Sequence, residues 1–306
     1  MANILIRSPY YFSDSEATSL SAKLELSING NLEYTIVKDT VISSVLFEIS
    51  ELVSDYLDLT YDGTYTSQVV VISGVVTFYT GKNGGGDAVG NQRQFNHIGL
   101  EGYSTFKEGK NLEIIDETLL QSNTTMYVPE GVAGYVPYID EGEIIYQSFN
   151  TSATSATVVG QTINIIRTCD PKYTPIKVTF VNKFGAFQDI YFDKKNVQKY
   201  TSTSENYKRN IIGLDGSYST TRHQSYNKNF SSTESITMNT GFVGEAFDEV
   251  INQLTLSAYI WGDIGGEIIP LTIVTTDQTR KTHLNDKLIN YTIEFKYAYD
   301  YINNIR

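Results

Sequence analysis

Apolar and polar residues alternate with a period of two along much of this 306-residue chain. Between Ala22 and Ile28 every second residue is apolar, and the residues between them are Lys, Glu and Ser. Asn29 and Gly30 follow, and this dipeptide favours a type I′ hairpin turn because both residues tolerate a positive φ. The apolar alternation resumes at Leu32. The segment therefore predicts a β-hairpin with one buried face.

The same alternation, or a run of β-branched and aromatic residues, predicts most other elements as strands. Beyond the first hairpin, strands are expected near 67–81, 125–128, 143–149, 156–159, 177–181, 190–192, 268–276 and 289–299. Gly74 interrupts the first of these and predicts a bulge or a close approach. The last alternates apolar and polar residues from Ile289 to Tyr299, which is typical of a long strand with one buried face.

Two short segments show helical spacing instead. Ser50 is predicted to cap a helix that begins at about Glu51 and ends near Asp58, with acidic residues in its first half. A second helix is predicted from about Gly244 to Leu254. Its apolar face consists of Phe247, Val250, Ile251 and Leu254. Each half of the chain therefore combines strands with one short amphipathic helix.

The stretch FVNKFGAFQDIYF, residues 180–192, predicts a further hairpin around a glycine. Gly185 suits a turn position with positive φ, and Asn182 favours the first position of such a turn. Three phenylalanines are expected in the core of the second domain: Phe180, Phe187 and Phe192. Phe184 lies in the turn itself, and we expect it either to fold back over the end of the domain or to contact a neighbouring subunit.

The length and the pattern of breaks predict two domains, 1–169 and 170–306. The border is placed near Asp170, because Pro171 and Pro175 interrupt the run of strands. The Gly-rich stretch 81–91 predicts a flexible loop, and the region from about 80 to 150 predicts a loop-rich insertion in the first domain. The expected fold is all-β and mainly antiparallel, with two β-sandwich-like domains that each carry one short helix.

Composition narrows the classes of protein that fit. The formal net charge is −12, which argues against sequence-specific or broad nucleic-acid binding. No apolar run approaches the about 18 residues of a membrane span, and the N-terminal residues lack the pattern of a signal peptide. Cys169 is the single cysteine, so no internal disulfide forms and a reducing compartment is expected. Tyr is abundant, with 23 residues, and suits both half-buried strands and interfaces.

No motif of known chemistry is complete. The three histidines, His97, His223 and His283, lack partners at metal-ligand spacing, so no metal or cofactor is expected. GKNGGGD resembles a phosphate loop but its lysine precedes the glycines. The acidic residues near Asp140 fit a glycosidase pair in principle and a solvated surface more simply. These observations predict a protein that is not an enzyme.

Several stretches of the second half resemble a tail or neck protein type of tailed bacteriophages of Bacteroidetes and marine hosts, including crAss-like phages. The stretches are FVNKFGAFQDIYF (180–192), NTGFVGEAFDEVINQLTLSAYIW (239–261) and the last 39 residues from IIPLTIVTT onward. The opening NILIRSPYYF and VLFEISELVSDYL (45–57) look like the N-terminal part of such proteins. Residues 80–165 resemble nothing we recognise.

The resemblance implies a non-enzymatic virion component made in the host cytoplasm. Such a protein would assemble in many copies, as a ring around the tail or neck axis, with other tail, neck or portal proteins as partners. The acidic charge suggests the hypothesis that DNA passes through an acidic channel without being recognised.

Expected contact elements in such an assembly are an exposed arm near 218–232, the loop 81–91 and open strand edges. The candidate interface residues are Phe184, Tyr218, Tyr226, Phe230, Lys82 and Asn83. Two alternatives remain open at this point. A carbohydrate- or receptor-binding module would use tyrosine faces, although Trp261 is the only Trp and its position suits core packing. A hydrolase would need a pair of carboxylates brought together by the fold.

Overall fold

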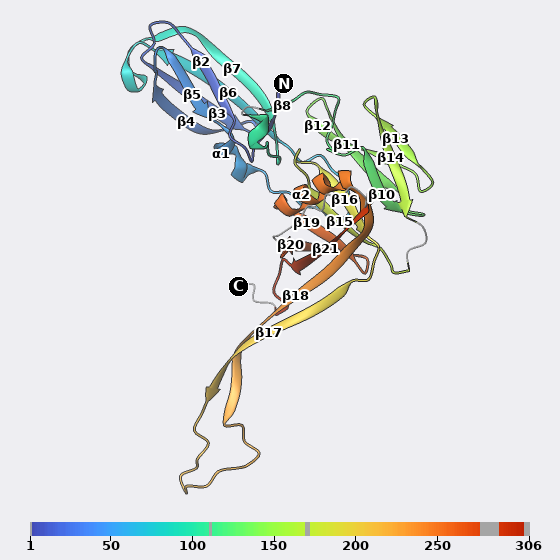
Figure 1. Cartoon of the computed structure of the whole chain (residues 1–306). Helices are drawn as coiled ribbons and strands as arrows, with labels where there is room; N and C mark the ends of the chain where they lie inside the picture. Colours follow the sequence, from blue (N-terminus) through green and yellow to red (C-terminus); the bar gives the residue numbers. More distant parts are fainter. Residues whose placement is uncertain (1, 110–111, 169–171, 276–287, 303–306) are drawn as a thin grey trace.

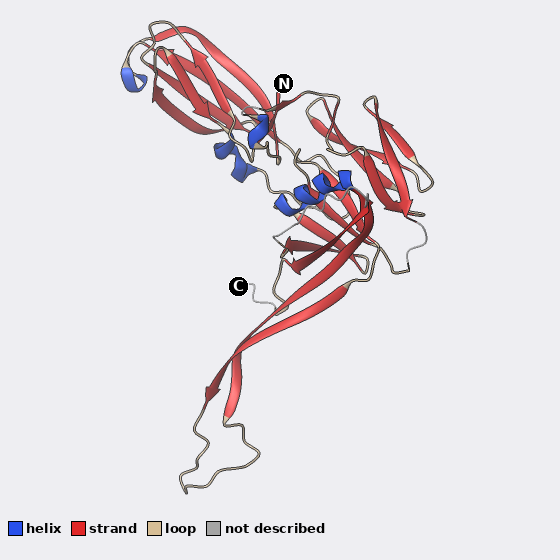
Figure 2. Ribbon diagram, in the orientation of Figure 1, coloured by secondary structure: helices blue, strands red, loops and turns tan. Residues whose placement is uncertain are grey.

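The computed structural model describes residues 2–109, 112–168, 172–275 and 288–302. Within these residues the strands form five sheets, accompanied by two short α-helices (Figure 2). Most strand pairs are antiparallel; β1 with β7 and β10 with β14 are parallel. The expected all-β, mainly antiparallel fold is confirmed. Neither α-helix in the described part of the chain has the length and apolar character needed to cross a bilayer.

The first domain is built on a six-stranded sheet and a two-stranded one. The spatial order of the large sheet is β4 (Asn31–Asp39), β3 (Ser21–Ile28), β6 (Val70–Tyr79), β7 (Ala88–Leu100), β1 (Ala2–Leu5) and β8 (Glu113–Ile114). The small sheet pairs β2 (Tyr11–Ser15) with β5 (Ser44–Glu48). Leu24 and Phe78 of the large sheet and Phe47 of the small one share one buried core. This part is therefore sandwich-like (Figure 1).

The predicted hairpin at the start of the chain is confirmed in detail. Asn29 and Gly30 have φ of 50° and 84°, as a type I′ turn requires. The four alternating apolar residues of β3 are all buried: Ala22, Leu24, Leu26 and Ile28. A shift of register after Leu26 pairs Ser27 with Leu32, whose side chain is 59% exposed. Leu32 therefore does not continue the buried face on β4.

Gly74 marks a close approach and not a bulge. A Cβ at this position would lie 2.2 Å from the ring of Phe95 on the neighbouring strand β7. The register shift between β6 and β7 falls instead between Val76 and Phe78. The flexible loop predicted over 81–91 is partly wrong. A tight 3₁₀ turn, η2 (Lys82–Gly84), closes the hairpin, and β7 already begins at Ala88.

Residues 118–168 form two three-stranded sheets around their own core. One contains β12 (Glu143–Phe149), β11 (Gly134–Asp140) and β9 (Thr118–Leu119), and the other β10 (Thr125–Pro129), β14 (Gln161–Thr168) and β13 (Ser155–Val158). The strands predicted at 125–128, 143–149 and 156–159 are confirmed. Within the region from about 80 to 150 that was expected to be loop-rich, β7 and β11 are regular strands. The first half of β7 is largely exposed and shows no apolar alternation, so the sequence pattern does not predict it.

The second half is one seven-stranded sheet. Its spatial order is β16 (Phe187–Phe192), β15 (Ile176–Val181), β19 (Ile260–Ile264), β20 (Glu267–Ile273), β21 (Leu288–Tyr297), β18 (Ser225–Gly244) and β17 (Val197–Lys208). Helix α2 (Asp248–Leu256), preceded by a 3₁₀ turn η4 (Glu245–Phe247), packs on one face. The four residues predicted for its apolar face are all buried: Phe247, Val250, Ile251 and Leu254. In β21 the predicted one-face burial is confirmed from Ile289 to Tyr297.

The helix predicted from 51 to 58 is shorter and capped differently. Helix α1 spans Ser50–Val53 and continues as a 3₁₀ turn, η1 (Ser54–Tyr56). Ser50 is the first helical residue and not the cap. The backbone N–H of Glu51 donates to the Glu48 carboxylate at 3.2 Å, while the Ser50 hydroxyl accepts from the N–H of Tyr10 at 3.1 Å. The Glu48 carboxylate, three residues before Glu51, thus caps the start of the helix in place of the Ser50 hydroxyl.

The two halves share core residues. Phe187 lies in the core of the first domain, with Val181 and Trp261, and not in the second-domain core that holds Phe180 and Phe192. The prediction for Phe187 is therefore wrong. Trp261 is 9% exposed, as expected for a packing residue. The predicted border at 169–170, including Cys169, lies outside the described residues.

Candidate assembly surfaces

The long hairpin of β17 and β18 projects from the second domain as an arm (Figure 1). Strand β18 pairs with β21 only from Ser235 to Gly244, so its first ten residues extend beyond the sheet with β17 alone. Of the 34 residues from 197 to 230, 32 are exposed, the exceptions being Tyr207 and Ile211. Two-stranded ribbons are marginally stable in isolation. The outer part of this arm therefore presents both faces of a ribbon, while nearer the body the ring of Tyr200 lies 6.1 Å from that of Tyr301.

Side-chain contacts across the two strands stiffen the arm. The rings of Tyr207 and Tyr226, which are register partners, lie 4.4 Å apart, and Arg209 and Lys228 lie over them at 5.5 and 5.6 Å. Cross-strand aromatic and cation–π pairs each contribute about 0.5–1 kcal/mol. These contacts hold the two strands of the arm together as a ribbon.

The three aromatic residues predicted for the arm are exposed to solvent, as a contact with another chain would need. Tyr218, Tyr226 and Phe230 are 64%, 39% and 55% exposed. The expectation of an exposed hairpin arm is confirmed, and its polar beginning is strand β17. Their contact with a partner stays a prediction.

Lys82 and Asn83 lie at the opposite end of the molecule, in the turn between β6 and β7 (Figure 1). Both are exposed. Asn83 has φ of 52°, and its backbone N–H donates to the Asp39 carboxylate at 2.8 Å. The structure therefore does not bring these two residues together with the arm residues within one chain.

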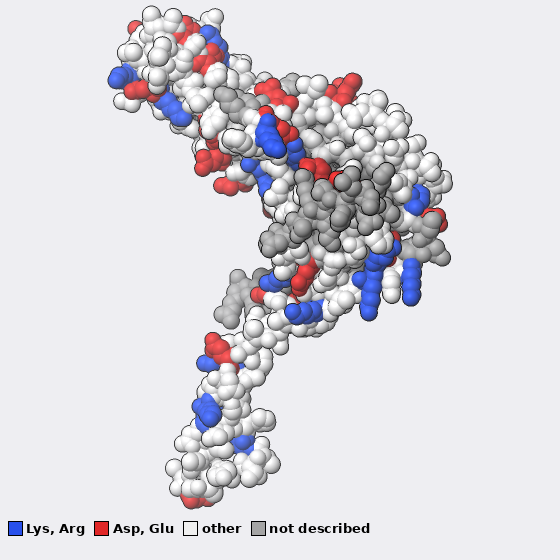
Figure 3. Space-filling view, viewed as in Figure 1, with Lys and Arg blue, Asp and Glu red and all other residues white. Residues whose placement is uncertain are grey.

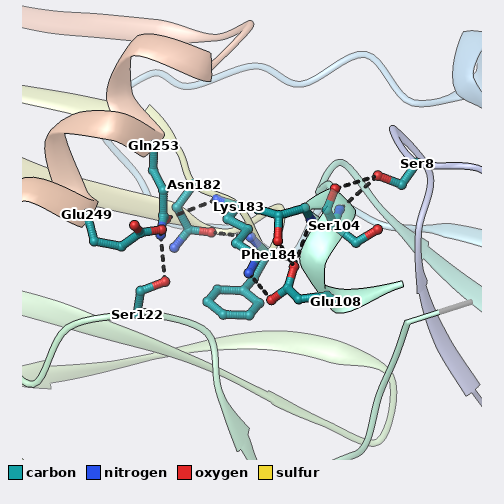
Figure 4. A network of polar contacts seen from close by, with 10 residues as sticks. Ser8, Ser104, Glu108, Ser122, Asn182, Lys183, Phe184, Glu249 and Gln253 are labelled. Carbon is teal, nitrogen blue, oxygen red and sulfur yellow. Dashed lines mark hydrogen bonds and ion pairs between the residues drawn. The ribbon is translucent and has the colours of Figure 1, made fainter. Parts of the chain in front are cut away.

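Phe184 lies at a junction of the two halves (Figure 4). Its ring is half-buried against a core cluster that includes Leu5, Leu100 and Leu120. Of the two predicted placements, Phe184 thus takes the one in which it folds back. The side chain of Lys183 lies 5.6 Å above its ring.

The turn that carries Phe184 is fixed by hydrogen bonds from every side. The Asn182 carboxamide oxygen accepts from the N–H groups of Phe184 and Ala186 at 2.9 and 3.2 Å, as predicted for the first turn position. Its amide nitrogen donates to the carbonyl of Leu120 at 2.7 Å. Gln253 of α2 accepts from the N–H of Lys183 at 3.2 Å and donates to Ser122 (Figure 4). The turn therefore links three parts of the chain.

Lys183, which is buried, forms an ion pair with Glu108, which is exposed. Burial alone would raise the pKa of Glu108, but hydrogen bonds from Lys183 and Thr105 outweigh it and hold the pKa below its ordinary value. Glu108 also closes a capping box with Thr105 at the 3₁₀ turn η3 (Phe106–Glu108). A carboxyl group whose pKa is lowered by folding stabilises the folded state at every pH above its unfolded-state pKa. This stabilisation is lost as the pH falls through the folded-state pKa.

We expect the junction to be acid-sensitive through Glu108. Thermal unfolding of the wild type and of Glu108→Gln should differ most near neutral pH, and the two should converge as the pH is lowered through the titration of Glu108. Glu113→Gln, which removes the carboxylate that accepts from Tyr10, is the control for loss of another carboxylate. A difference between the wild type and Glu108→Gln that does not change with pH would contradict the assignment.

Phe184→Ser should lower the free energy of unfolding by about 1–2 kcal/mol, because a half-buried aromatic ring is lost from the junction. Urea unfolding measures this effect. Phe106→Ser is the matched control, since Phe106 is 102% exposed and should change the free energy by less than about 0.5 kcal/mol. An unchanged stability of Phe184→Ser would show that the ring does not support the junction.

A cavity of about 510 Å³ lies between the start of β15, the end of β16 and the Tyr65 segment. Tyr65, Tyr135 and Tyr191 line its walls, together with Lys177 and Asp189. Lys177 donates to the hydroxyls of Tyr61 and Tyr65 at 3.0 and 3.3 Å. The Asp189 carboxylate accepts from the hydroxyls of Tyr65 and Thr179, the latter at 2.7 Å. The cavity thus combines aromatic walls with one cation, Lys177, and two carboxylates, Asp189 and Asp263.

Lys177 and Asp189 have related pKa shifts. Burial raises the pKa of Asp189, and the neighbouring Lys177, Tyr65 and Thr179 only partly offset it. Burial would lower the pKa of Lys177, but the charge of Asp189 and the hydroxyl of Tyr61 outweigh it, so that the pKa is raised. Lys177 therefore stays protonated at neutral pH.

The sequence did not point to Lys177 or Asp189. Their partners Tyr61 and Tyr65 are more than 100 positions away from Lys177 along the chain. One signal was present: Lys177 and Thr179 alternate with apolar residues in a strand that is buried on both faces. A polar residue at such a position needs a partner.

The other candidates for chemistry lie apart. His97 is buried in β7, with its ring 5.1 Å from that of Phe95, and His223 is exposed in the arm, while His283 lies outside the described residues. Across the described residues, no three His, Cys, Asp or Glu side chains cluster as metal ligands. Asp140 and Glu143 are opposed in the tight turn between β11 and β12.

No protein-family model, curated protein or solved structure matches this chain.

Proposed function

We propose that the protein is a non-enzymatic structural component of a tailed-phage virion that assembles in multiple copies, as a ring in the tail or neck. The observation that carries the proposal is the arm, in which 32 of 34 residues are exposed. An exposed ribbon of this length, with Tyr218 and Phe230 on its surface, gains stability when it packs on another chain. The resemblance of residues 180–192, 239–261 and 268–306 to tail and neck proteins supports the same function.

Mass photometry of the purified chain, followed by electron microscopy of the chain and of its parent particle, tests this function. The expected result is a defined oligomer, or a ring at one level of the tail or neck. Monomers alone, both in isolation and beside neighbouring virion proteins, would contradict it. In a ring, an acidic lumen would agree with passage of DNA through the channel, and a basic lumen would exclude it.

A carbohydrate- or receptor-binding module is the second candidate, and the cavity beside Lys177 favours it. Concave sites with aromatic walls and a few converging polar groups are typical of small-ligand binding. A glycan array tests this candidate, with Tyr135→Ala as the variant, because the Tyr135 side chain lines the cavity and is 39% exposed. Glycan signals that Tyr135→Ala abolishes would support it; an array without signals would exclude it.

A further inference from the structure

The arm differs in charge from the rest of the chain. Residues 197–230 contain five Lys or Arg and two Asp or Glu, a net charge of +3. The other 272 residues contain 18 basic and 33 acidic side chains, a net charge of −15. Figure 3 shows the basic side chains spaced along the arm. The arm is therefore electrostatically complementary to the body of its own chain.

One of the three stretches of more than 40 residues without any basic residue lies around helix α1. From 39 to 81 there are six Asp or Glu and no Lys, Arg or His. Five of the carboxylates are exposed, and four of them lie in α1 or after it: Glu51, Asp55, Asp58 and Asp62. None of these four forms an ion pair with any residue that the structure describes. This face therefore retains an uncompensated negative charge.

A concave surface adjoins the first of these carboxylates, Glu51. A groove of about 470 Å³ is lined by Glu48, Glu51, Pro9 and Tyr11. Arg7 also lines it, but its guanidinium lies 3.9 Å from Glu101 and donates to the carbonyl of Leu256 at 3.0 Å. The groove thus offers both apolar surface and acidic rim to a basic, tyrosine-bearing segment.

We propose that the arm of one copy docks on the acidic face beside α1 of a second copy. The arm leaves the second domain in the direction away from α1, so it does not fold onto the face of its own chain (Figure 1). The contact joins two different surfaces and is therefore heterologous, and repeated heterologous contacts close into a ring or extend as a filament. Complementary charges also set the register and speed encounter. This inference rests on the proposed multi-copy function and names its contact.

Charge reversal in two places tests the contact. Lys208→Glu/Arg222→Glu reverses the charge of two exposed residues in the arm. Glu51→Lys/Asp55→Lys reverses the charge of two exposed residues on the acidic face. Each double variant alone should weaken self-association at least about tenfold in sedimentation velocity at low salt, and an equimolar mixture of the two should restore it. Added salt should weaken the wild-type oligomer, because the Debye length falls from about 10 Å at 0.1 M to about 3 Å at 1 M.

Lys172→Glu/Lys296→Glu is the matched control, since it changes the net charge by the same amount at two exposed lysines of the body. It should leave self-association unchanged. A wild-type oligomer that neither reversal weakens would overturn the docking and leave the multi-copy function standing. A wild type that is monomeric in solution and in the particle would overturn both. Binding of duplex DNA that the arm reversal abolishes, with self-association intact, would assign the basic arm to nucleic acid and overturn the docking as well.

Discussion

Gly185→Ala is expected to lower the free energy of unfolding by about 3–4 kcal/mol, as a residue at a special backbone position in a crowded site. Gly185 has φ of +84°, and an added Cβ would lie 2.7 Å from the backbone nitrogen of Glu101. That atom belongs to the backbone of the first domain and cannot rotate away. The substitution therefore forces the turn away from the loop that it contacts.

Gly30→Ala separates the two causes of this loss. Gly30 has the same φ of +84°, but an added Cβ would meet nothing within 4 Å. In Gly30→Ala the free energy of unfolding should fall only by the cost of the left-handed conformation, about 1–2 kcal/mol. Urea unfolding of both variants gives the difference, which measures the contact between the halves. Equal losses would mean that the junction adapts and that the close approach has no energetic weight.

The sequence predicts those parts of the fold that local chemistry decides. The turn at Asn29-Gly30 needs two positive φ values, and few residue pairs supply them. Helix α2 has its apolar residues at helical spacing whatever they pack against. Gly185 and Asn182 were likewise assigned correctly, because their roles depend on the turn and not on its surroundings.

The predictions that failed depend on what covers a surface. Phe187 and Phe192 are five positions apart in one strand, so their side chains point to opposite faces of the sheet. Both faces are buried, which sends Phe192 into the second-domain core and Phe187 into the first. Period-two alternation identifies two faces but does not say that a different layer covers each. The placement of Lys177 and Asp189 was missed for the same reason.

The candidate interface residues also differ in whether local sequence alone decides their exposure. Tyr218, Tyr226 and Phe230 were predicted from a polar, Tyr-rich stretch without alternation, and such a stretch is exposed wherever it lies. Phe184 was predicted from its turn position alone, which leaves its surroundings open. The acidic face near α1 was overlooked because the whole chain is acidic, and only the fold shows that Glu48 and Glu51 lie at a groove.

Lys177→Met should lower the free energy of unfolding by about 2–3 kcal/mol at neutral pH. The substitution keeps the aliphatic chain but removes the cation nearest to the buried Asp189 carboxylate, and an uncompensated buried charge is strongly destabilising. It also removes the donors to Tyr61 and Tyr65, which connect the segment before β6 to the second domain. Lys38→Met is the control, because Lys38 lies over Phe47 at 5.4 Å but is exposed, and it should cost less than about 0.5 kcal/mol.

The pH dependence of this loss identifies its cause. The pKa of Asp189 is already raised by burial, and removal of Lys177 raises it further, so stability falls as the pH rises through the folded-state value. The difference in free energy of unfolding between the wild type and Lys177→Met should therefore become smaller in acid, where Asp189 is protonated. Lys177→Met/Asp189→Asn should recover about 1–2 kcal/mol at neutral pH, because the charge is gone and the amide oxygen still accepts from one of the two hydroxyls, Tyr65 or Thr179, which donate to different carboxylate oxygens in the wild type. A deficit that is independent of pH and not relieved by Asp189→Asn would show that the loss comes from packing of the lysine chain alone.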